Sequence, residues 1–294
     1  MEPVPQVSWQ QMAHPDRFLL ACVMGWPIAH SRSPLLHNYW FKRHGLAGTY
    51  VPLAIRPEGL AAALHALQPL GFAGVNLTIP HKQHAMTLVD EVDPVAIRIG
   101  AISCVVVRSD GSLVGSNNDC YGFIHNLKQS APAWRANAGP IVVLGAGGGA
   151  RAVCYGLLQE GAKKIRLVNR TLARANGIAA EFGSEIEVLT WEEREDALAG
   201  AAMVVNATSQ GMAGQPALDI RLDTLPKTAL AADIIYVPLE TPFLAAARKR
   251  GNPTLNGLGM LLHQGRPAWK EWFGLEPEVT AELRALMEKS ILSD

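Results

Sequence analysis

The run VNLTIPHK, residues 75 to 82, combines residue types that can bind a small polar molecule and move a proton on it. In an extended strand, side chains two residues apart point to the same face, so Asn76 and Thr78 would share one face. Pro80 closes the run, since proline cannot donate a ladder hydrogen bond, and Lys82 follows it. A lysine beside this polar platform can polarise a carbonyl group and transfer a proton. The alternative is an ordinary loop end with solvated side chains.

A glycine-rich turn in the second half indicates a nucleotide site. A buried strand, Ile141 to Leu144, runs into Gly-x-Gly-x-x-Ala and a helical pattern. Glycines let the backbone approach a pyrophosphate, whose charge is met by amide N–H groups and the helix N-terminus. The alternative is a turn that only packs helix on strand. The predicted cofactor contacts are Gly145, Ala146, Gly147, Gly148, Gly149 and Ala150.

The end of the next strand predicts which dinucleotide binds. An NAD enzyme usually has an acidic residue here for the ribose 2′-hydroxyl, whereas this chain has Asn169, Arg170 and Thr171, with Arg174 one turn later. A carboxylate would repel a 2′-phosphate, but arginines and a hydroxyl can pair with it. The alternative is a solvated helix start. At this distance from the glycine turn, the four residues favour NADP as the cofactor.

A third motif, PIAHSRSPLLHNYW, has serines at the start of a predicted helix. Ser33 before Pro34 is typical of an N-cap followed by proline in the first helical turn. The same arrangement can also bind an anion, because Ser31, Ser33 and the helical N–H groups can converge on a carboxylate.

Composition narrows the class of protein. The 294 residues are 49% apolar and 18% charged, enough for two hydrophobic cores. Lysine plus arginine equals aspartate plus glutamate, 26 against 26, so nothing favours nucleic acid or an anionic membrane as partner. The four cysteines lack zinc-site spacing, and the histidines form no convincing ligand set, so no metal is predicted. With no run of membrane-spanning length and no basic signal-peptide start, we expect a soluble cytoplasmic protein that acts on a small molecule.

The predicted fold class is α/β, because short β-branched or apolar runs alternate with helical segments as in parallel βαβ units. A polar segment at 128–139 resembles an inter-domain connection. The expected strands are RFLLACVM, GTYVPLAI, GVNLTI, ISCVVV, PIVVLGAG, KKIRLVN, MVVNAT and ALAADII, and the clearest helices PLLHNYWFKRHG and ARAVCYGLLQEGA.

In this order along the chain, the motifs resemble the shikimate dehydrogenase family. The similar stretches are GWPIAHSRSP, GVNLTIPHK, GSNNDCYGF, GAGGGAR, NRTLAR, NATSQGM, DIIYVPLETPFL and NGLGMLLHQ. The resemblance implies a substrate domain at residues 1–125, completed by the C-terminal segment 256–294, and a Rossmann-like NADP domain at 126–255. It places the active site in the cleft between the domains. The implied substrate is shikimate or a related hydroxylated cyclic carboxylic acid, and the implied chemistry is hydride transfer.

The same resemblance assigns roles to individual residues. Lys82 and Asp119 match the catalytic pair, which would move the proton that accompanies hydride transfer. Substrate contacts are expected from Ser31, Ser33, Asn76, Thr78, Ser103, Tyr236 and Gln264. The nicotinamide half of the cofactor is expected near Asn206, Ala207, Thr208, Ile234, Gly257 and Met260.

Two stretches of the expected pocket depart from the family pattern. Where the family commonly reads Gly-Ala-x-Asn-Thr, the last two positions are Ser103 and Cys104. Where it commonly reads Asn-Thr-Asp-Gly, the second and fourth positions are Asn118 and Cys120. A serine hydroxyl reaches less far than an amide and makes fewer hydrogen bonds, although Asn118 could compensate. We therefore expect a divergent member whose substrate is shikimate, quinate or a similar acid.

Two hypotheses from different classes of protein stay open. The stretch ATSQG at 207–211 approaches a hydrolase nucleophile elbow but lacks its first glycine. A non-catalytic NADP-binding regulator is also compatible with the fold. The sequence leaves open whether the chain is a monomer or a homodimer. It also leaves open whether it serves aromatic amino acid biosynthesis or a catabolic pathway.

Overall fold

Strands and helices alternate along the chain, and the strands form two separate sheets. The computed structural model describes residues 18–293. These divide into a first unit, made of 18–97, Ala101–Asn118 and Gly265–Leu283, and a second unit, made of Arg98–Gly100, Asp119–Gln264 and 284–293. The predicted α/β class is confirmed.

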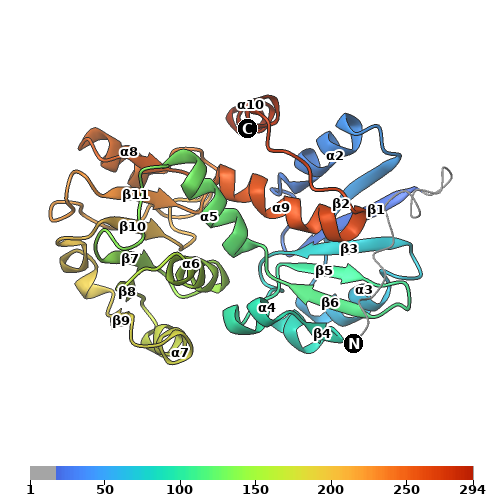
Figure 1. Cartoon of the computed structure of the whole chain (residues 1–294), viewed down its shortest axis with the longest axis horizontal. Helices are drawn as coiled ribbons and strands as arrows, with labels where there is room; N and C mark the ends of the chain where they lie inside the picture. The colour runs from blue at the N-terminus through green and yellow to red at the C-terminus, as the bar shows by residue number, and fades with distance from the viewer. Residues whose placement is uncertain (1–17, 294) are drawn as a thin grey trace. The chain divides into compact units, whose positions relative to one another are not determined.

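The first unit contains a six-stranded mixed sheet in the order β2-β1-β3-β5-β6-β4 (Figure 1). β1 pairs in parallel with β2 and β3, whereas β5 pairs antiparallel with β3 and β6. The strands are β1 (Leu19–Gly25), β2 (Gly48–Ala54), β3 (Phe72–Leu77), β4 (Glu91–Val92), β5 (Cys104–Val107) and β6 (Leu113–Ser116). The segments between them form α2 (Ser33–Arg43), η1 (Pro57–Gly59), α3 (Leu60–His65), η2 (His84–Thr87) and α4 (Pro94–Ile99).

An aromatic cluster fills part of the first unit. The ring of His37 stacks on Tyr50 with centroids 4.0 Å apart, and Trp269 Nε1 donates to His37 Nδ1 over 2.6 Å. Trp272 donates to the carbonyl of Val105 at 3.1 Å, which ties the C-terminal part of the chain to β5.

The second unit contains a six-stranded sheet in the order β12-β11-β10-β7-β8-β9, with every pair parallel (Figure 1). Its strands are β7 (Ile141–Leu144), β8 (Ile165–Val168), β9 (Ile186–Leu189), β10 (Met203–Asn206), β11 (Leu230–Asp233) and β12 (Thr254–Leu255). Its other elements are α5 (Asp119–Ser130), α6 (Gly148–Gln159), α7 (Leu172–Phe182), η3 (Glu192–Arg194), η4 (Asp196–Leu198) and α8 (Pro242–Lys249). By sequence, α9 (Leu258–Phe273) begins in the second unit and ends in the first, and α10 (Ala281–Leu292) begins in the first and ends in the second.

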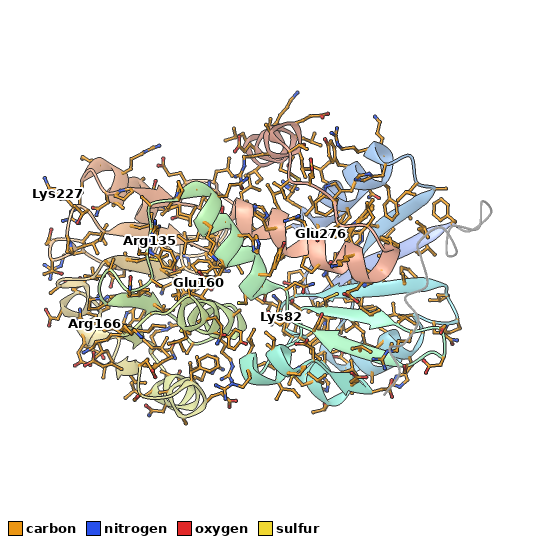
Figure 2. The ribbon with its side chains drawn as sticks, viewed as in Figure 1. Lys82, Arg135, Glu160, Arg166, Lys227 and Glu276 are labelled. Atoms are coloured by element: carbon orange, nitrogen blue, oxygen red, sulfur yellow. The ribbon has the colours of Figure 1, made fainter. Side chains whose placement is uncertain are left out.

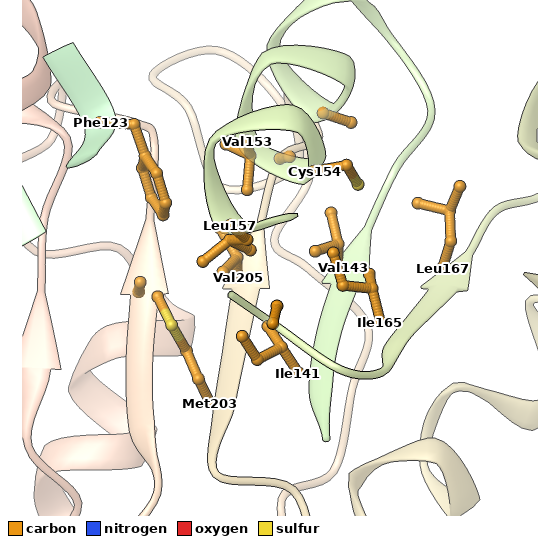
Figure 3. Close-up of a cluster of buried hydrophobic side chains, with 14 of the residues drawn as sticks. Phe123, Ile141, Val143, Val153, Cys154, Leu157, Ile165, Leu167, Met203 and Val205 are labelled. Atoms are coloured by element: carbon orange, nitrogen blue, oxygen red, sulfur yellow. The ribbon is translucent and has the colours of Figure 1, made fainter. Parts of the chain in front are cut away.

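This parallel sheet is buried on both faces, which explains its continuous apolar strands. On one face, Val143 and Val205 pack against Val153 and Leu157 of α6 (Figure 3). The opposite face carries Val142, Leu144 and Val204, together with Phe243 and Leu244 of α8. Alternate residues of β7 therefore belong to two separate hydrophobic cores, one on each face of the sheet.

Several local predictions need correction. The first sheet is mixed, not purely parallel, and β4, β6, β9 and β12 were not predicted, because they are short or carry polar and glycine residues. Ser33 is not an N-cap: Arg32 holds that position and does not cap the helix with its side chain, and Ser33 begins α2. Part of the segment 128–139 ends α5, and all of it lies inside the second unit.

The compact units also differ in their boundaries from the predicted domains 1–125 and 126–255. The N-terminal part of the first unit is interrupted at Arg98–Gly100 and ends at Asn118, and only Gly265–Leu283 of the segment 256–294 joins it. Residues 1–17 and 294 of the predicted domains lie outside the described residues. The roles assigned to the two domains stay predictions.

Candidate functional site

The serines of the first motif lie where the chain enters α2. The hydroxyl of Ser31 accepts a hydrogen bond from the backbone N–H of Ser33 at 3.3 Å, and Pro34 follows in the first turn. Ser31 is half-buried and Ser33 is buried. Two hydroxyls thus stand at the positive end of an 11-residue helix, the arrangement expected for a carboxylate site.

Tyr50, which the sequence did not single out, joins two predicted substrate contacts. Its hydroxyl donates to Asn76 Oδ1 at 2.8 Å and also hydrogen-bonds the side chain of Ser33. Tyr50 is 1% exposed, and burial raises the pKa of its hydroxyl well above the ordinary value. A tyrosine within an apolar strand signals such a contact, since a buried phenol needs a polar partner, but the sequence does not say which one.

Backbone hydrogen bonds bring the segments of Thr78, Lys82 and Ser103 together within the first unit. The N–H of Leu77 donates to the carbonyl of Ser103 at 2.9 Å, and the N–H of Ile102 donates to the carbonyl of Lys82 at 2.8 Å. Thr78 lies one residue beyond β3. Lys82, labelled in Figure 2, is half-buried. The polar platform and its lysine therefore lie at and beyond the carboxyl end of β3.

Ser103 is 5% exposed and uses its hydroxyl inside the protein. Its Oγ accepts a hydrogen bond from the backbone N–H of Asn118 at 2.8 Å. The neighbouring Asn117 donates through Nδ2 to the carbonyl of Ala101 at 2.8 Å. The two stretches that depart from the family pattern are thus joined by a hydrogen bond between Ser103 and the backbone of Asn118.

In the second unit, the predicted cofactor residues gather at the carboxyl edge of the sheet. The chain proceeds from β7 to β8 and β9 on one side, and then returns to β10, β11 and β12 on the other. Such a reversal of strand order is where open α/β sheets bind ligands.

The glycine turn between β7 and α6 fits a pyrophosphate. Gly145 has φ +106°, and a Cβ there would lie 3.0 Å from the carbonyl oxygen of Ala207, so a side chain would be strained. Gly147 caps α6, is exposed, and would have open space around a Cβ. The N-terminus of this 12-residue helix is therefore open at Gly147, and Ala146, Gly148, Gly149 and Ala150 complete the turn.

The basic residues after β8 are available to a ligand. Arg170, Thr171 and Arg174 are exposed, and Asn169 shapes the turn by donating to the carbonyl of Thr171 at 2.8 Å. No acidic side chain stands among these residues, which matches the donor set that a 2′-phosphate requires.

The residues expected around the nicotinamide lie at or just beyond the ends of β10, β11 and β12. Backbone hydrogen bonds between neighbouring strands continue there. Ala207 N–H donates to the carbonyl of Leu144 at 2.9 Å, and Ile234 N–H donates to that of Asn206 at 3.1 Å. Gly257 approaches so closely that a Cβ would lie 2.1 Å from the Ile234 oxygen. Thr208 is half-buried next to this ladder, and Met260 on α9 is 8% exposed.

The remaining predicted residues also belong to the second unit. Asp119, the first residue of α5, is 1% exposed, whereas Tyr236 and Gln264 are half-buried. Lys82 belongs to the first unit, so the predicted Lys82–Asp119 pair draws one residue from each unit.

Among residues 18–293, no group of three or more histidine, cysteine, aspartate or glutamate side chains is arranged to hold a metal ion. No helix in the described part of the chain has the length and apolar character needed to cross a membrane.

Comparisons with known proteins agree with this geometry. The family description "Shikimate dehydrogenase substrate binding domain" matches residues 23–105, and "Shikimate / quinate 5-dehydrogenase" matches residues 128–236. The shikimate dehydrogenase (NADP(+)) of Rhodospirillum rubrum is 54% identical over 270 residues, which cover 90% of this chain and 95% of the relative.

Solved structures give the same result. Shikimate 5-dehydrogenase from Thermus thermophilus, in complex with NADP(H) and shikimate, has a TM-score of 0.81 and 36% identity, covering 94% of this chain and 99% of that one. Quinate dehydrogenase from Corynebacterium glutamicum, in complex with NAD, has a TM-score of 0.85 and 32% identity, with the same coverage. The chain described here belongs to the shikimate dehydrogenase family.

Proposed function

We propose that this protein is an NADP-dependent dehydrogenase that interconverts shikimate and 3-dehydroshikimate. The similarity to the Rhodospirillum rubrum enzyme, 54% identity over 90% of this chain, carries the proposal. The glycine turn at the strand-order reversal and the exposed arginines after β8 support NADP as the cofactor. Family membership favours this oxidoreductase over the hydrolase and the regulatory protein.

We assign the substrate contacts to residues of both units. In the first, Ser31 and Ser33 hold the carboxylate at the start of α2, where the helix dipole stabilises negative charge. Ring hydroxyls are bound by Asn76, Thr78 and Ser103 of the first unit and by Tyr236 and Gln264 of the second.

We assign proton transfer to Lys82 and Asp119. When bound, NADP supplies a nicotinamide ring that accepts a hydride from the carbinol carbon. Lys82 then takes the hydroxyl proton as the carbon–oxygen double bond forms, and in the reverse direction it returns the proton. Asp119 orients the lysine amine, and its 1% exposure suits a group that works by hydrogen bonding out of bulk water.

Quinate is the second candidate substrate, supported by the quinate dehydrogenase similarity and by the Ser103 and Asn118 departures. Initial rates with shikimate and quinate, each with NADP and with NAD, separate the candidates. The proposal expects the highest kcat/KM for shikimate with NADP. A higher kcat/KM for quinate would make quinate the substrate. A higher kcat/KM with NAD than with NADP would contradict the role proposed for Arg170 and Arg174. A cytoplasmic location and a monomeric or homodimeric state stay predictions.

A further inference from the structure

A buried carboxylate lies at the carboxyl end of β11, among the residues assigned to the nicotinamide. Asp233 is 2% exposed and accepts hydrogen bonds from the backbone N–H of Ile235 at 2.9 Å and from Thr241 Oγ1 at 2.8 Å. Asn206 Nδ2 lies 3.2 and 3.1 Å from its two oxygens. These neutral donors replace the water that the carboxylate has lost. Burial nevertheless raises the pKa of Asp233 to about 6, and its hydrogen bonds oppose this shift.

The carboxylate fixes which way the amide of Asn206 points. Because Nδ2 faces Asp233 and the carbonyl of Gln210, Oδ1 must face Thr208. There it accepts from Thr208 N at 3.1 Å and from Thr208 Oγ1 at 2.7 Å. The Thr208 hydroxyl in turn accepts from Gln210 N at 3.1 Å. The conformation of the turn after β10 therefore depends on an acceptor at the end of the neighbouring strand.

The same carboxylate holds the turn after β11. Asp233 binds the N–H of Ile235, whose carbonyl accepts from Gly257 N at 2.9 Å. Gly257 is packed against the backbone of Ile234 with no room for a Cβ. One side chain thus fixes both backbone segments that we assign to the nicotinamide.

We propose that Asp233 is a positioning residue for the nicotinamide half of NADP, acting through the amide orientation of Asn206 and the backbone of Ile235. This inference rests on the proposed cofactor. Asp233 was not among the residues that the sequence analysis selected.

Asp233→Asn keeps the shape of the side chain but replaces an acceptor with an NH₂ group. Each of the two carboxylate oxygens of Asp233 lies near two hydrogen-bond donors. The new NH₂ group must therefore face a donor in either orientation of the asparagine amide. If Asn206 turns its amide to escape this contact, its NH₂ faces Thr208 N–H and the turn after β10 loses its anchor. Because β7 separates β10 from β8, we expect the disturbance at β10 and β11 not to reach the arginines after β8.

Binding of two ligands to the full-length protein without substrate tests the proposal. NADP spans both halves of the site, whereas 2′,5′-ADP carries only the phosphate-bearing adenosine half. For Asp233→Asn, we expect the Kd for NADP to rise about tenfold and the Kd for 2′,5′-ADP to stay within about twofold. Equal losses for both ligands, or no loss for NADP, would overturn the proposal. Since no turnover is needed, failure to oxidise shikimate would count against the substrate alone.

The matched control is Asn252→Ala, near the opposite end of β11. Asn252 is 4% exposed and donates to the carbonyls of Pro226 at 2.8 Å and Ala229 at 2.9 Å. Removal of the Asn252 side-chain amide should lower the Tm of the protein without changing its Kd for NADP. If the control weakens NADP as much as Asp233→Asn does, the effect of Asp233 is general destabilisation and the proposal fails.

Thr241 provides a second pair of variants should Asp233→Asn not fold. Thr241→Val removes one donor from the carboxylate, and Thr241→Ser keeps the hydroxyl. We expect Thr241→Val to weaken NADP but not 2′,5′-ADP, with affinity recovered in Thr241→Ser. The absence of this difference would contradict the role of Asp233.

Discussion

The buried hydroxyl of Ser103 accepts a hydrogen bond from the backbone N–H of Asn118 at 2.8 Å. Both residues belong to the stretches where the chain departs from the family pattern, and Ser103 is also a predicted substrate contact. Substitution of Ser103 alters this contact directly, because the Ser103 hydroxyl is the acceptor, whereas Asn118 contributes its backbone N–H.

Ser103→Asn should change kcat/KM for shikimate or quinate by about tenfold, since a gained or lost hydrogen bond is worth roughly 1 to 3 kcal/mol. Initial rates with both acids provide the measurement. The matched variants are Asn118→Thr and the double substitution. If the pair acts together, the effects of the single substitutions will not add in the double variant. Unchanged kcat/KM for both acids would show that Ser103 has no part in recognition.

Tyr50→Phe should raise the KM for shikimate about tenfold and leave the Kd for NADP unchanged. The variant removes the hydroxyl that binds Asn76 and Ser33 in the first unit. Tyr39→Phe is the control, because the Tyr39 hydroxyl donates to the exposed Glu282 at 3.0 Å. Equal KM values for the two variants would mean that Tyr50 only fills space.

Arg170→Ala should weaken NADP about 10- to 100-fold and NAD much less, since a charge-assisted hydrogen bond to the 2′-phosphate is worth roughly 1.5 to 3 kcal/mol. Titration of both dinucleotides gives the ratio. Arg166→Ala is the control, because Arg166 (Figure 2) lies on β8, the strand that precedes Arg170, but donates to the carbonyls of Ala197 and Ala199, both at 2.7 Å. Equal loss of NADP and NAD in Arg170→Ala would contradict the phosphate role.

His37 should make the fold less stable in acid. Burial lowers the pKa of His37 from an ordinary 6.5 to about 3, so the folded protein favours the neutral ring. As far as His37 is concerned, the free energy of unfolding is highest above pH 6.5 and decreases as the pH falls from 6.5 towards 3. Over this window, wild type should lose about 1.4 kcal/mol per pH unit more than His37→Asn, which keeps an acceptor near Nδ1 for Trp269.

Denaturant unfolding of both proteins at several pH values isolates the histidine, since the other titrating groups are common to the two. Parallel stability curves would show that His37 is not the group that titrates.

The sequence predicted those parts of the fold whose signal is local. The run IVVL is apolar throughout because β7 is buried on both faces, and the glycine turn after it follows from backbone requirements at Gly145. All eight expected strands are present in the structure, with shifted ends. The two-residue strands β4 and β12 are set by pairing with distant partners, so their own residues carry no signal.

The supporting contacts of the site depend on tertiary structure. Tyr50 and Asn76 are distant in sequence, and their hydrogen bond arises because β2 and β3 both flank β1. The Asp233–Asn206 contact likewise requires β10 and β11 to be neighbours. The sequence showed that these polar residues existed, but not which of them would meet.

The central claim is that Lys82 moves the proton during oxidation of shikimate with NADP. The most direct measurement is the initial rate of NADP reduction by shikimate for wild type and Lys82→Ala, with NADP binding measured alongside. Lys128→Ala serves as the control, since Lys128 pairs with Glu160 at 2.8 Å on the surface. We predict a fall in kcat of at least about 100-fold for Lys82→Ala, with NADP affinity retained and Lys128→Ala unaffected. Turnover in Lys82→Ala close to that of wild type would contradict the account.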